Sequence, residues 1–569
     1  MHLLLHFLRA YPARSTLMLL ALLLAGMAEG IGLSALLPLL NIAVRNDTGR
    51  SAGDDANAFE RIVLDTLHSL NIAPGIGSML VIIVLAVTCR NLLLMFARQQ
   101  VGYTAAQVAT DLRLDMLSAM LRTRWEYFIH QPVGSVTNRL ATEATRSAQA
   151  FVNGITIITF GIQSLVYGGV AVAVSWKATL FALAIGSLII GASHFLVRMS
   201  KRAGKKQTKL LIQLMRRLTD TLTSVKSLKS MGKEHLAGQV LSMETTRLNK
   251  AMRRQVFASA VLNAAQDEMF SLVIALGMFI ALTRLDMELT TVMVLVVVLG
   301  RMLSQLGKIQ KQYQKMIVGE SAFWSLHQGV QEARAAEEPM GSGETPSLEK
   351  GIHLQNVRFG YLPGQPVLHN IELDIPAGRL TTLTGASGGG KTTIVDLVIG
   401  LLKPWEGEIR IDGVPLQQLD LRAWRRMIGY VPQETMLLHS SVLHNVTLGD
   451  PALDEADAIH ALKAASAWDF VQDLPEGLYS MVGERGIRLS GGQRQRIMIA
   501  RALVHRPRLL IMDEATSALD PENEAAISRA MEALKGQLTI LAISHQKAMI
   551  EAADRVWHLE GGRATRVDG

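Results

Sequence analysis

The stretch RLTTLTGASGGGKTTIVDLVIGLL, residues 379–402, predicts the fold of the C-terminal part of the chain. It begins as an apolar strand, passes through a loop rich in glycine and continues as an amphipathic helix. Gly385, Gly390, Lys391 and Thr392 fit the pattern G-x-x-x-x-G-K-[ST] at every fixed position, and the strand before the loop and the helix after it are the context that supports this motif. We therefore predict an α/β P-loop ATPase domain.

The residues of this loop have distinct expected tasks toward ATP and Mg²⁺. Backbone N–H groups are expected to wrap the β-phosphate, and they belong to Gly385, Ser387, Gly388 and Gly390. Lys391 would reach the β- and γ-phosphate oxygens, and the Thr392 hydroxyl would bind Mg²⁺. Thr393 is a further candidate for a phosphate contact.

A second stretch, RPRLLIMDEATSALD (residues 506–520), carries two adjacent acids at the end of a predicted strand. A carboxylate at a strand end beside a P-loop is where Mg²⁺ is held, so we assign that role to Asp513. Glu514 is then placed to orient and deprotonate the attacking water, which is the role of a general base. Two solvated acids are the alternative, but the P-loop upstream favours the catalytic interpretation.

A third stretch, LSGGQRQR (residues 489–496), also predicts an anion site. A serine and two glycines precede a polar, basic run that has the character of a helix start, and a helix N-terminus offers free N–H groups to an anion. One nucleotide would thus face two phosphate sites, which the spacing of the motifs alone does not explain.

The remainder of the chain has a different composition. At 569 residues the chain is too long for one hydrophobic core, and 49% hydrophobic with 19% charged residues is unusual for a wholly soluble protein. The one cysteine, Cys89, excludes an intrachain disulfide and a cysteine-rich metal site, and we expect it to be a small buried hydrophobe. The net charge of +8 does not indicate nucleic acid, because the basic residues follow membrane topology.

Six segments are apolar enough to cross a bilayer, which takes about 20 residues each; they are residues 15–44, 76–97, 151–175, 178–197, 257–283 and 287–306. The predicted fold class is a membrane α-helical domain with six transmembrane helices plus a cytoplasmic α/β P-loop ATPase domain. The basic segments 98–150 and 198–254 are assigned to the cytoplasm, and the acidic segment 45–75 faces outward. Both termini are then cytoplasmic.

The two cytoplasmic segments are too long and too helical in composition to be simple loops. We expect them to continue the membrane helices, with turns at FIHQPVG (residues 128–134) and SVKSLKSMGK (residues 224–233). They either bind anionic lipid headgroups or act as levers on the next domain. The stretch QEARAAEEPMGSGETPSLEK predicts a linker, so the predicted domains are residues 1–330 and 351–569, joined by residues 331–350.

Together these motifs resemble those of the ABC exporter half-transporters, in which a membrane domain is fused ahead of a nucleotide-binding domain. The resemblance covers nearly the whole chain. It implies that Tyr361 stacks on adenine, that Gln433 in YVPQE senses Mg²⁺ and contacts the membrane domain, and that His545 holds the γ-phosphate. It also assigns a cross-contact loop to VGERG (residues 482–486), the signature to residues 489–493 and a dimer-contact loop to SALD (residues 517–520).

The resemblance explains the second phosphate site. In this family two nucleotide-binding domains pack head to tail, so the signature of one chain would close over the γ-phosphate held by Lys391 of the other. The signature residues of the nucleotide site are Ser490, Gly491, Gly492 and Gln493. The chain would then work as a dimer by alternating access, with FIHQPVG and SVKSLKSMGK as coupling helices.

One departure from the family pattern follows the last motif. The family commonly has His-Arg-Leu where this chain has His545, Gln546 and Lys547. The histidine is retained, so hydrolysis is expected to be intact. Because every nucleotide motif is in its active form, we expect a homodimer with two working sites, and a dimer with a different partner chain is the alternative.

Polar residues inside the predicted spans indicate where the transported molecule binds. They are Glu29, Arg90, His194, Asp267, Glu268 and Arg301. The candidate substrate residues among them are Glu29, Arg90, Asp267 and Arg301. The alternative is that they pair across helices or lie near helix ends. Asp267 and Glu268 are adjacent, so at most one is expected to face a cavity.

Short matches indicate a lipid as the substrate. The outward segment NAFERIVLDTLHSLNI (residues 57–72) has apolar residues at helical spacing, Glu29 is followed nine residues on by Pro38, and Arg90 lies in the second span. This combination is similar to the bacterial lipid-linked oligosaccharide flippases. It implies outward movement of a lipid or lipid-linked glycan. Arginines of this chain would bind the pyrophosphate of that lipid bidentately.

The motifs are also compatible with two other functions. Export of a peptide or hydrophobic small molecule is the alternative, and a non-pumping membrane ATPase that regulates a partner is the second. Nucleic acid is not an expected partner, whereas membrane lipids and a second copy of the chain are. The resemblance to bacterial members predicts a bacterial inner membrane.

Overall fold

The computed structural model describes the chain except residues 1–6, 8, 37, 41–74, 178, 181–182, 185–205, 207–208, 211–212, 216, 220, 222–223, 284–288, 340–342, 484–485, 516–520 and 568–569. The side chains at positions 133, 234, 236, 237, 240, 255, 258, 259, 262, 263, 266, 267, 318 and 521–526 also lie outside the described residues. The chain divides into two compact units. Unit 1 is Met1–Ala119 with Val133–Glu332, and unit 2 is Met120–Pro132 with Ala333–Gly569.

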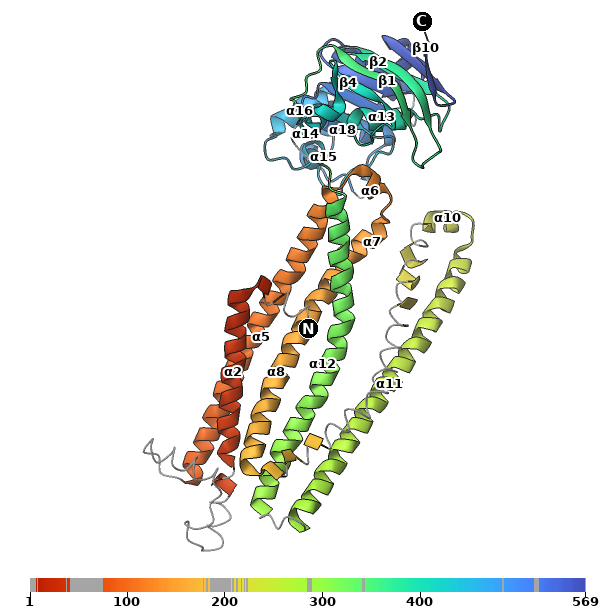
Figure 1. Ribbon diagram of the computed structural model, residues 1–569. Coiled ribbons are helices and arrows are strands. Elements are labelled where there is room, and N and C mark those ends of the chain that lie inside the picture. Colours follow the sequence, from red (N-terminus) through yellow and green to blue (C-terminus); the bar gives the residue numbers. More distant parts are fainter. Residues whose placement is uncertain are drawn as a thin grey trace. The chain divides into compact units, whose positions relative to one another are not determined.

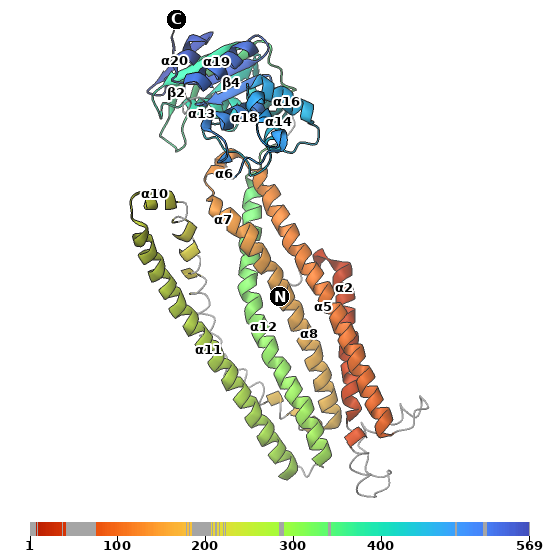
Figure 2. The same cartoon turned by 180° about the vertical axis from the view of Figure 1, so that it is seen from behind.

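Long helices make up unit 1 (Figures 1 and 2). They are α2 (Pro12–Ser34), α5 (Ile76–Leu121), α8 (Ala144–Val174), α11 (Glu234–Thr283) and α12 (Leu289–Ala335), with the short elements α7 (Val133–Asn138), η1 (Arg139–Glu143) and α10 (Val225–Ser230). With 46 residues, α5 is roughly 70 Å long at about 1.5 Å per residue, more than twice the ~30 Å thickness of a hydrocarbon core. This length agrees with the prediction that the second membrane helix continues beyond the bilayer.

Apolar side chains hold these helices together. Leu22, Val101, Phe151 and Phe323 belong to one buried cluster that joins α2, α5, α8 and α12. The helices α2 and α8 pack closely at Gly26, where an added Cβ would lie 2.9 Å from Ile162 Cγ2. Glycine is therefore required at this helix contact, because a larger residue would force the helices apart.

Four of the six predicted spans are supported among the described residues. Pro12–Leu40, Ile76–Leu121, Gly134–Val174 and Leu289–Ala335 are long and apolar enough to cross a membrane. The predicted span 178–197 falls largely outside the described residues, and the one at 257–283 lies in α11, where the described apolar stretch Glu268–Thr283 is shorter. Six spans therefore stay a prediction, and the predicted external helix at residues 57–72 lies outside the described residues.

One local expectation was wrong, and the start of the predicted linker is helical. Cys89 is exposed on α5 rather than buried, because few side chains of the described part of unit 1 cover that face of the helix. The stretch predicted as a linker begins as helix, since α12 continues to Ala335. Its first residues, QEARA, include alanine, glutamate and arginine, which have high helix propensity.

Unit 2 contains two sheets (Figure 1). The antiparallel sheet has the order β2-β1-β4-β5, formed by β1 (Gly351–Phe359), β2 (Leu368–Pro376), β4 (Glu406–Ile411) and β5 (Val414–Pro415). The second has the order β10-β9-β3-β8-β7-β6, formed by β3 (Leu380–Gly385), β6 (Ile428–Val431), β7 (Leu509–Asp513), β8 (Thr539–Ile543), β9 (Arg555–Glu560) and β10 (Arg563–Val567). The α/β class predicted for this part of the chain is confirmed.

Helices and short turns accompany the strands of unit 2. They are α13 (Lys391–Ile399), α14 (Leu421–Arg426), α15 (Val442–Thr447), α16 (Glu455–Ala464), α17 (Trp468–Gln472), α18 (Gly491–Leu503), α19 (Pro521–Leu534) and α20 (Lys547–Glu551), with the 3₁₀ turns η2 (Leu416–Gln418) and η3 (Gly477–Tyr479). Unit 2 also includes α6 (Trp125–Ile129), which lies at the first of the two predicted turns. Ile394 of α13 and Ile511 of β7 are fully buried in the core between the sheets.

Parallel pairing brings the polar strand ends together. β8 pairs in parallel with both β3 and β7, and β6 pairs in parallel with β7. The carboxyl ends of parallel strands meet at one edge of the sheet, where such folds bind ligands. The P-loop after β3, the acids at the end of β7 and the segments after β6 and β8 therefore share this edge.

Candidate functional site

The P-loop is shaped by its first glycine and its lysine. Gly385 has φ +131°, and an added Cβ there would lie 2.1 Å from Leu559 O, so only glycine fits. Lys391 begins α13 and is buried. Its Nζ donates to Gly385 O at 2.7 Å and to Ala386 O at 3.0 Å. The ammonium is thereby held inside the glycine loop, where a phosphate would meet it.

Oxygen ligands for a hard cation lie beside the loop. Thr392 Oγ1 donates to Asp513 Oδ1 at 3.4 Å, and Tyr430 OH donates to Asp513 Oδ2 at 3.5 Å. Burial raises the pKa of Asp513 above its usual range, and the nearby Glu514 charge adds to this. Hydroxyl and carboxylate oxygens are what Mg²⁺ prefers, and a divalent cation would relieve the cost of the buried charge.

Glu514 is the centre of the site. It has φ +46°, an unusual conformation for a residue other than glycine and one that clusters at functional sites. Gln433 Nε2 donates to Glu514 Oε2 at 2.6 Å. Lys391 Nζ and His545 Nε2 each lie 3.8 Å from Glu514 Oε1. Three other predicted residues, from three different chain segments, therefore converge on this carboxylate.

The signature stretch forms the start of α18. Ser490 is its N-cap, and Ser490 Oγ accepts from Gln493 N at 3.2 Å while Gln493 Oε1 accepts from Ser490 N at 2.9 Å. This reciprocal capping box fixes the first turn of the helix. Ser490 and Gly491 are exposed and Gly492 is buried. The structure thus confirms that these residues start a helix, while their action on a second chain stays a prediction.

Tyr361 borders a cavity in unit 2 of about 530 Å³. Its hydroxyl lies 3.2 Å from Thr393 Oγ1, and its ring meets Phe359 edge to face at 5.3 Å between centroids. Trp405 and His130 line the same cavity. The sequence did not assign either residue to this cavity, because His130 was interpreted only as part of the turn FIHQPVG and both residues lie far from Tyr361 in the sequence.

Two other residues near the cation ligands were also missed. Burial raises the pKa of Asp396 to about 6, with Asp513 as the second cause. Burial likewise raises the pKa of Tyr430. An acid in the otherwise apolar run IVDLVIG and a tyrosine directly before VPQ were the available signals. The predicted dimer-contact loop, residues 517–520, and residues 484–485 of the cross-contact loop lie outside the described residues.

The two residues that depart from the family pattern after His545 lie at the start of α20 (Lys547–Glu551). Gln546 precedes α20 as its N-cap position. Lys547 is 90% exposed and pairs with Glu551 at 3.4 Å on the same helix. Gln546 N donates to Ser544 Oγ at 3.1 Å, and the Lys547–Glu551 pair does not include His545 or Glu514.

Three of the four predicted substrate residues meet inside unit 1. Glu29 of α2 is buried, Arg90 Nη2 of α5 lies 3.1 Å from Glu29 Oε1, and Arg301 Nη1 of α12 lies 3.9 Å from the same oxygen. Tyr167 OH of α8 also donates to Glu29 Oε1. Arg301 remains 53% exposed, so the cluster has one buried acid, one covered arginine and one arginine open to a ligand.

The remaining polar residues of the spans are less informative. The Asp267 side chain and His194 lie outside the described residues, and Glu268 is exposed. Gln305 Nε2 donates to Gln163 Oε1 at 3.0 Å in a buried contact between α12 and α8. Tyr167, Gln163 and Gln305 were missed as members of a polar layer, although polar residues in apolar helices are a recognisable signal.

Comparisons with known proteins agree with this geometry. Residues 16–306 match the family described as ABC transporter transmembrane region, and residues 368–517 match the family described as ABC transporter. A relative from Thiobacillus denitrificans named ATP-dependent lipid A-core flippase is 31% identical over 473 residues, covering 81% of this chain and 80% of the relative.

Two further comparisons extend this result. A Lactococcus lactis relative named multidrug resistance ABC transporter ATP-binding and permease protein is 28% identical over 464 residues, covering 78% of each chain. A solved structure titled as a bacterial Atm1-family ABC exporter with ATP bound has a TM-score of 0.77 at 22% identity, covering 95% of this chain and 93% of that one. At this identity the structural likeness supports the fold.

Proposed function

The chain belongs to the ABC transporter family, as an integral membrane exporter that hydrolyses ATP to drive transport, and we propose that it moves a lipid or lipid-linked glycan with an anionic headgroup outward. The Glu29, Arg90 and Arg301 cluster is the observation that supports this cargo. Arginine binds phosphate through a planar fork of donors, and Arg301 is half-exposed. The name of the Thiobacillus denitrificans relative, a lipid A-core flippase, supports the same class.

We infer the following roles at the ATP site. Lys391 and the N–H groups of the P-loop bind the phosphates of ATP, and Tyr361 stacks on its adenine ring. Thr392, Asp513 and Gln433 would hold Mg²⁺, which when bound neutralises charge on the phosphates. Glu514 accepts the proton of the attacking water. The 2.6 Å contact from Gln433 and the 3.8 Å approach of His545 orient that carboxylate.

We infer that two copies of the chain act together, head to tail. Ser490 and Gly491 are exposed at the start of α18, and their capping box uses the Ser490 and Gln493 side chains within one chain. The remaining free N–H groups of this helix start are then available to a phosphate bound by the other copy. Closure would depend on the γ-phosphate, and hydrolysis would release it, which gives a two-state cycle.

The cargo is tested by flipping of a fluorescent polyprenyl-pyrophosphate glycan in proteoliposomes. We expect ATP-dependent loss of the probe from the leaflet on the nucleotide side, and no loss with Glu514→Gln. Absence of flipping alongside normal basal ATPase activity would contradict the cargo assignment and leave the exporter. A hydrophobic dye and peptides are then the next probes, since one relative is named for multidrug resistance.

We propose the bacterial inner membrane as the location, with both termini in the cytoplasm. The named relatives are bacterial, and the basic segments that flank the predicted spans favour the cytoplasmic side. Protease protection of a C-terminal tag in inverted and right-side-out vesicles tests the orientation.

A further inference from the structure

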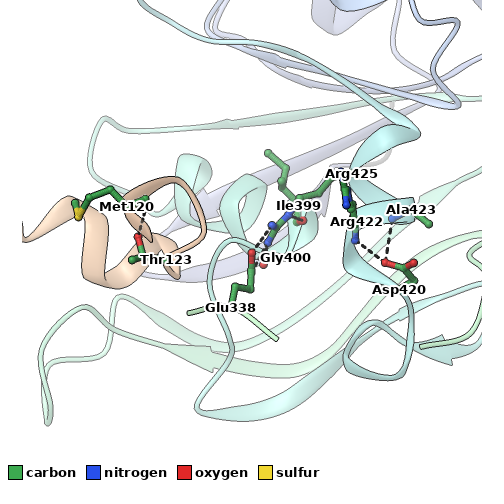
Figure 3. A network of polar contacts seen from close by, with 9 residues as sticks. All are labelled: Met120, Thr123, Glu338, Ile399, Gly400, Asp420, Arg422, Ala423 and Arg425. Carbon is green, nitrogen blue, oxygen red and sulfur yellow. Dashed lines mark hydrogen bonds and ion pairs between the residues drawn. The ribbon is translucent and has the colours of Figure 1, made fainter. Parts of the chain in front are cut away.

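One guanidinium in unit 2 connects the P-loop helix to the chain next to the membrane helices (Figure 3). Arg425 of α14 donates from Nη1 and Nη2 to the two carboxylate oxygens of Glu338, at 2.6 and 2.7 Å. It also donates from Nη2 to Gly400 O at 2.7 Å and from Nε to Ile399 O at 3.4 Å. The pair is largely covered, with 28% of the Arg425 and 16% of the Glu338 side chain exposed.

The carbonyls that Arg425 binds belong to the C-terminal end of α13. The last carbonyls of a helix lack partners within the helix and must find donors elsewhere. Beside Arg425, the buried Trp424 supplies one, since its Nε1 donates to Val398 O at 2.9 Å. Because α13 begins at Lys391, α14 holds the far end of the helix that binds the phosphates.

Glu338 lies beside the C-terminal ends of α5 and α12. Its backbone N donates to Arg122 O at 2.9 Å, and Arg124 N donates to Ala336 O at 2.9 Å. Arg122 follows directly on α5, and Ala336 follows directly on α12. The ends of α5 and α12 are thus joined by backbone hydrogen bonds, and the Glu338 side chain extends from this joint to Arg425.

The other end of α14 leads toward the catalytic centre. After Met427 the chain forms β6 (Ile428–Val431) and then reaches Gln433, which donates to Glu514. The joint also borders a cavity of about 610 Å³, so apolar packing does not fill its surroundings. Backbone hydrogen bonds of Glu344 with Gln418 and Asp420 also join this segment to the start of α14, and the Arg425–Glu338 pair adds a side-chain contact at its end.

We propose that Arg425 and Glu338 are positioning residues that carry nucleotide-dependent movement of α13 to α5 and α12 of the same chain. A bidentate arginine–carboxylate pair fixes orientation as well as distance, which a point charge does not. The same guanidinium also donates to the two carbonyls at the end of α13. One rigid planar group is therefore hydrogen-bonded both to Glu338 and to α13. The proposal rests on coupling of ATP hydrolysis to transport and does not depend on the identity of the cargo.

The test compares Glu338→Gln with Glu337→Gln in the full-length protein in lipid nanodiscs. Glu337 is the matched control, because its partner Arg122 is exposed and 3.7 Å away. In a Cys89→Ser background, spin labels replace the exposed Leu80 of α5 and Leu289 of α12. The readouts are the kcat and KM for ATP, and the change in label distance on trapping with ATP and vanadate.

We expect Glu338→Gln to keep kcat and KM within about twofold of the parent and to lose at least four fifths of the distance change. Glu337→Gln should respond as the parent does. Arg425→Lys should reproduce the loss, and the double variant should lose no more than either single one, since the residues act as one unit.

Three results would overturn the proposal. The first is an undiminished distance change in Glu338→Gln and Arg425→Lys. The second is a proportional fall of kcat and distance change, because the pair would then only stabilise the P-loop helix. The third is an equal loss in Glu337→Gln. Thermal unfolding of each variant identifies global destabilisation. A globally destabilised variant would lose kcat and the change in label distance in the same proportion.

Discussion

Glu514 in unit 2 and Glu29 in unit 1 are both single carboxylates surrounded by cations and donors, yet they occupy opposite kinds of backbone. Glu514 follows a strand, has φ +46° and receives residues from loops at one sheet edge. Glu29 lies within the regular helix α2 and receives residues from three other helices. Glu514 lies at the sheet edge beside the P-loop. Glu29 is a buried charge among packed helices.

This difference explains why the two sites are expected to respond differently to the same change. A carboxylate that accepts a proton in the reaction must be reached by water and by the γ-phosphate. A buried carboxylate beside a covered arginine such as Arg90 mainly lowers the cost of removing that arginine from water. Replacement of glutamate by glutamine removes the charge and retains the shape at both places, and it therefore separates the two roles.

The largest expected effect is that of Glu514→Gln. Loss of the general base should lower kcat for ATP hydrolysis by about 10²- to 10⁴-fold, while ATP binding is retained. Phosphate release and binding of a fluorescent ATP analogue measure the two quantities. A rate of hydrolysis within tenfold of the parent would show that another group takes the proton. Glu514 would then not differ from Glu29 by a catalytic role.

Glu29→Gln is expected to act on stability. Arg90 would keep its position with no opposite charge, at a cost on the order of 3 kcal/mol in unfolding free energy. Arg90→Gln added to this variant should recover most of the loss, because the unbalanced charge is then removed. Thermal unfolding in detergent gives the values. Equal stability of the parent and Glu29→Gln would mean that the cluster is solvated and does not resemble a buried ion pair.

Tyr361→Ala should have an intermediate effect. Loss of aromatic contact with the base, worth about 1–1.5 kcal/mol, should raise the KM for ATP by roughly tenfold without changing kcat. Tyr361→Phe removes only the contact with Thr393 and is the control. An unchanged KM in the alanine variant would show that adenine does not stack on Tyr361 and contacts another residue of the cavity, such as Trp405.

Asp396→Asn should have the smallest effect. The folded pKa of Asp396 is raised to about 6 from 3.8, so its contribution to stability is present below pH 4 and is lost as the pH rises through 6. The asparagine variant stays neutral, so its unfolding temperature should rise relative to the parent's between about pH 4 and pH 6 and then stay constant, by a few degrees at most. The comparison is made in chelator without nucleotide, and a gain that is independent of pH would contradict it.

The convergence of the candidate ATP-site residues at one sheet edge could be predicted from the sequence, because short local patterns place each of them. Gly385 needs a positive φ and close backbone approach, Lys391 must begin a helix, and Asp513 must end a strand. Parallel strand pairing then assembles these parts without further information. Asp396 and Trp405 escaped prediction because their contacts depend on how α13 and the antiparallel sheet pack.

The membrane cluster could be predicted only as separate residues. Helical periodicity does not say which faces of α2, α5 and α12 meet, so Glu29, Arg90 and Arg301 were candidates without partners. Tyr167 was missed because a tyrosine in a membrane helix is commonly an apolar contact. The Arg425–Glu338 pair was missed for another reason, since it joins a predicted linker to a helix that carries no motif.

The most direct test of the account compares two lipids in proteoliposomes, a fluorescent polyprenyl-pyrophosphate glycan and the same glycan on an uncharged linkage. We predict ATP-dependent flipping of the charged lipid at least tenfold faster than of the neutral one, and none of either lipid with Glu514→Gln. Arg301→Gln should remove the preference by slowing the charged lipid alone. Equal flipping of both lipids, or an intact preference in Arg301→Gln, would contradict recognition of an anionic headgroup by this cluster.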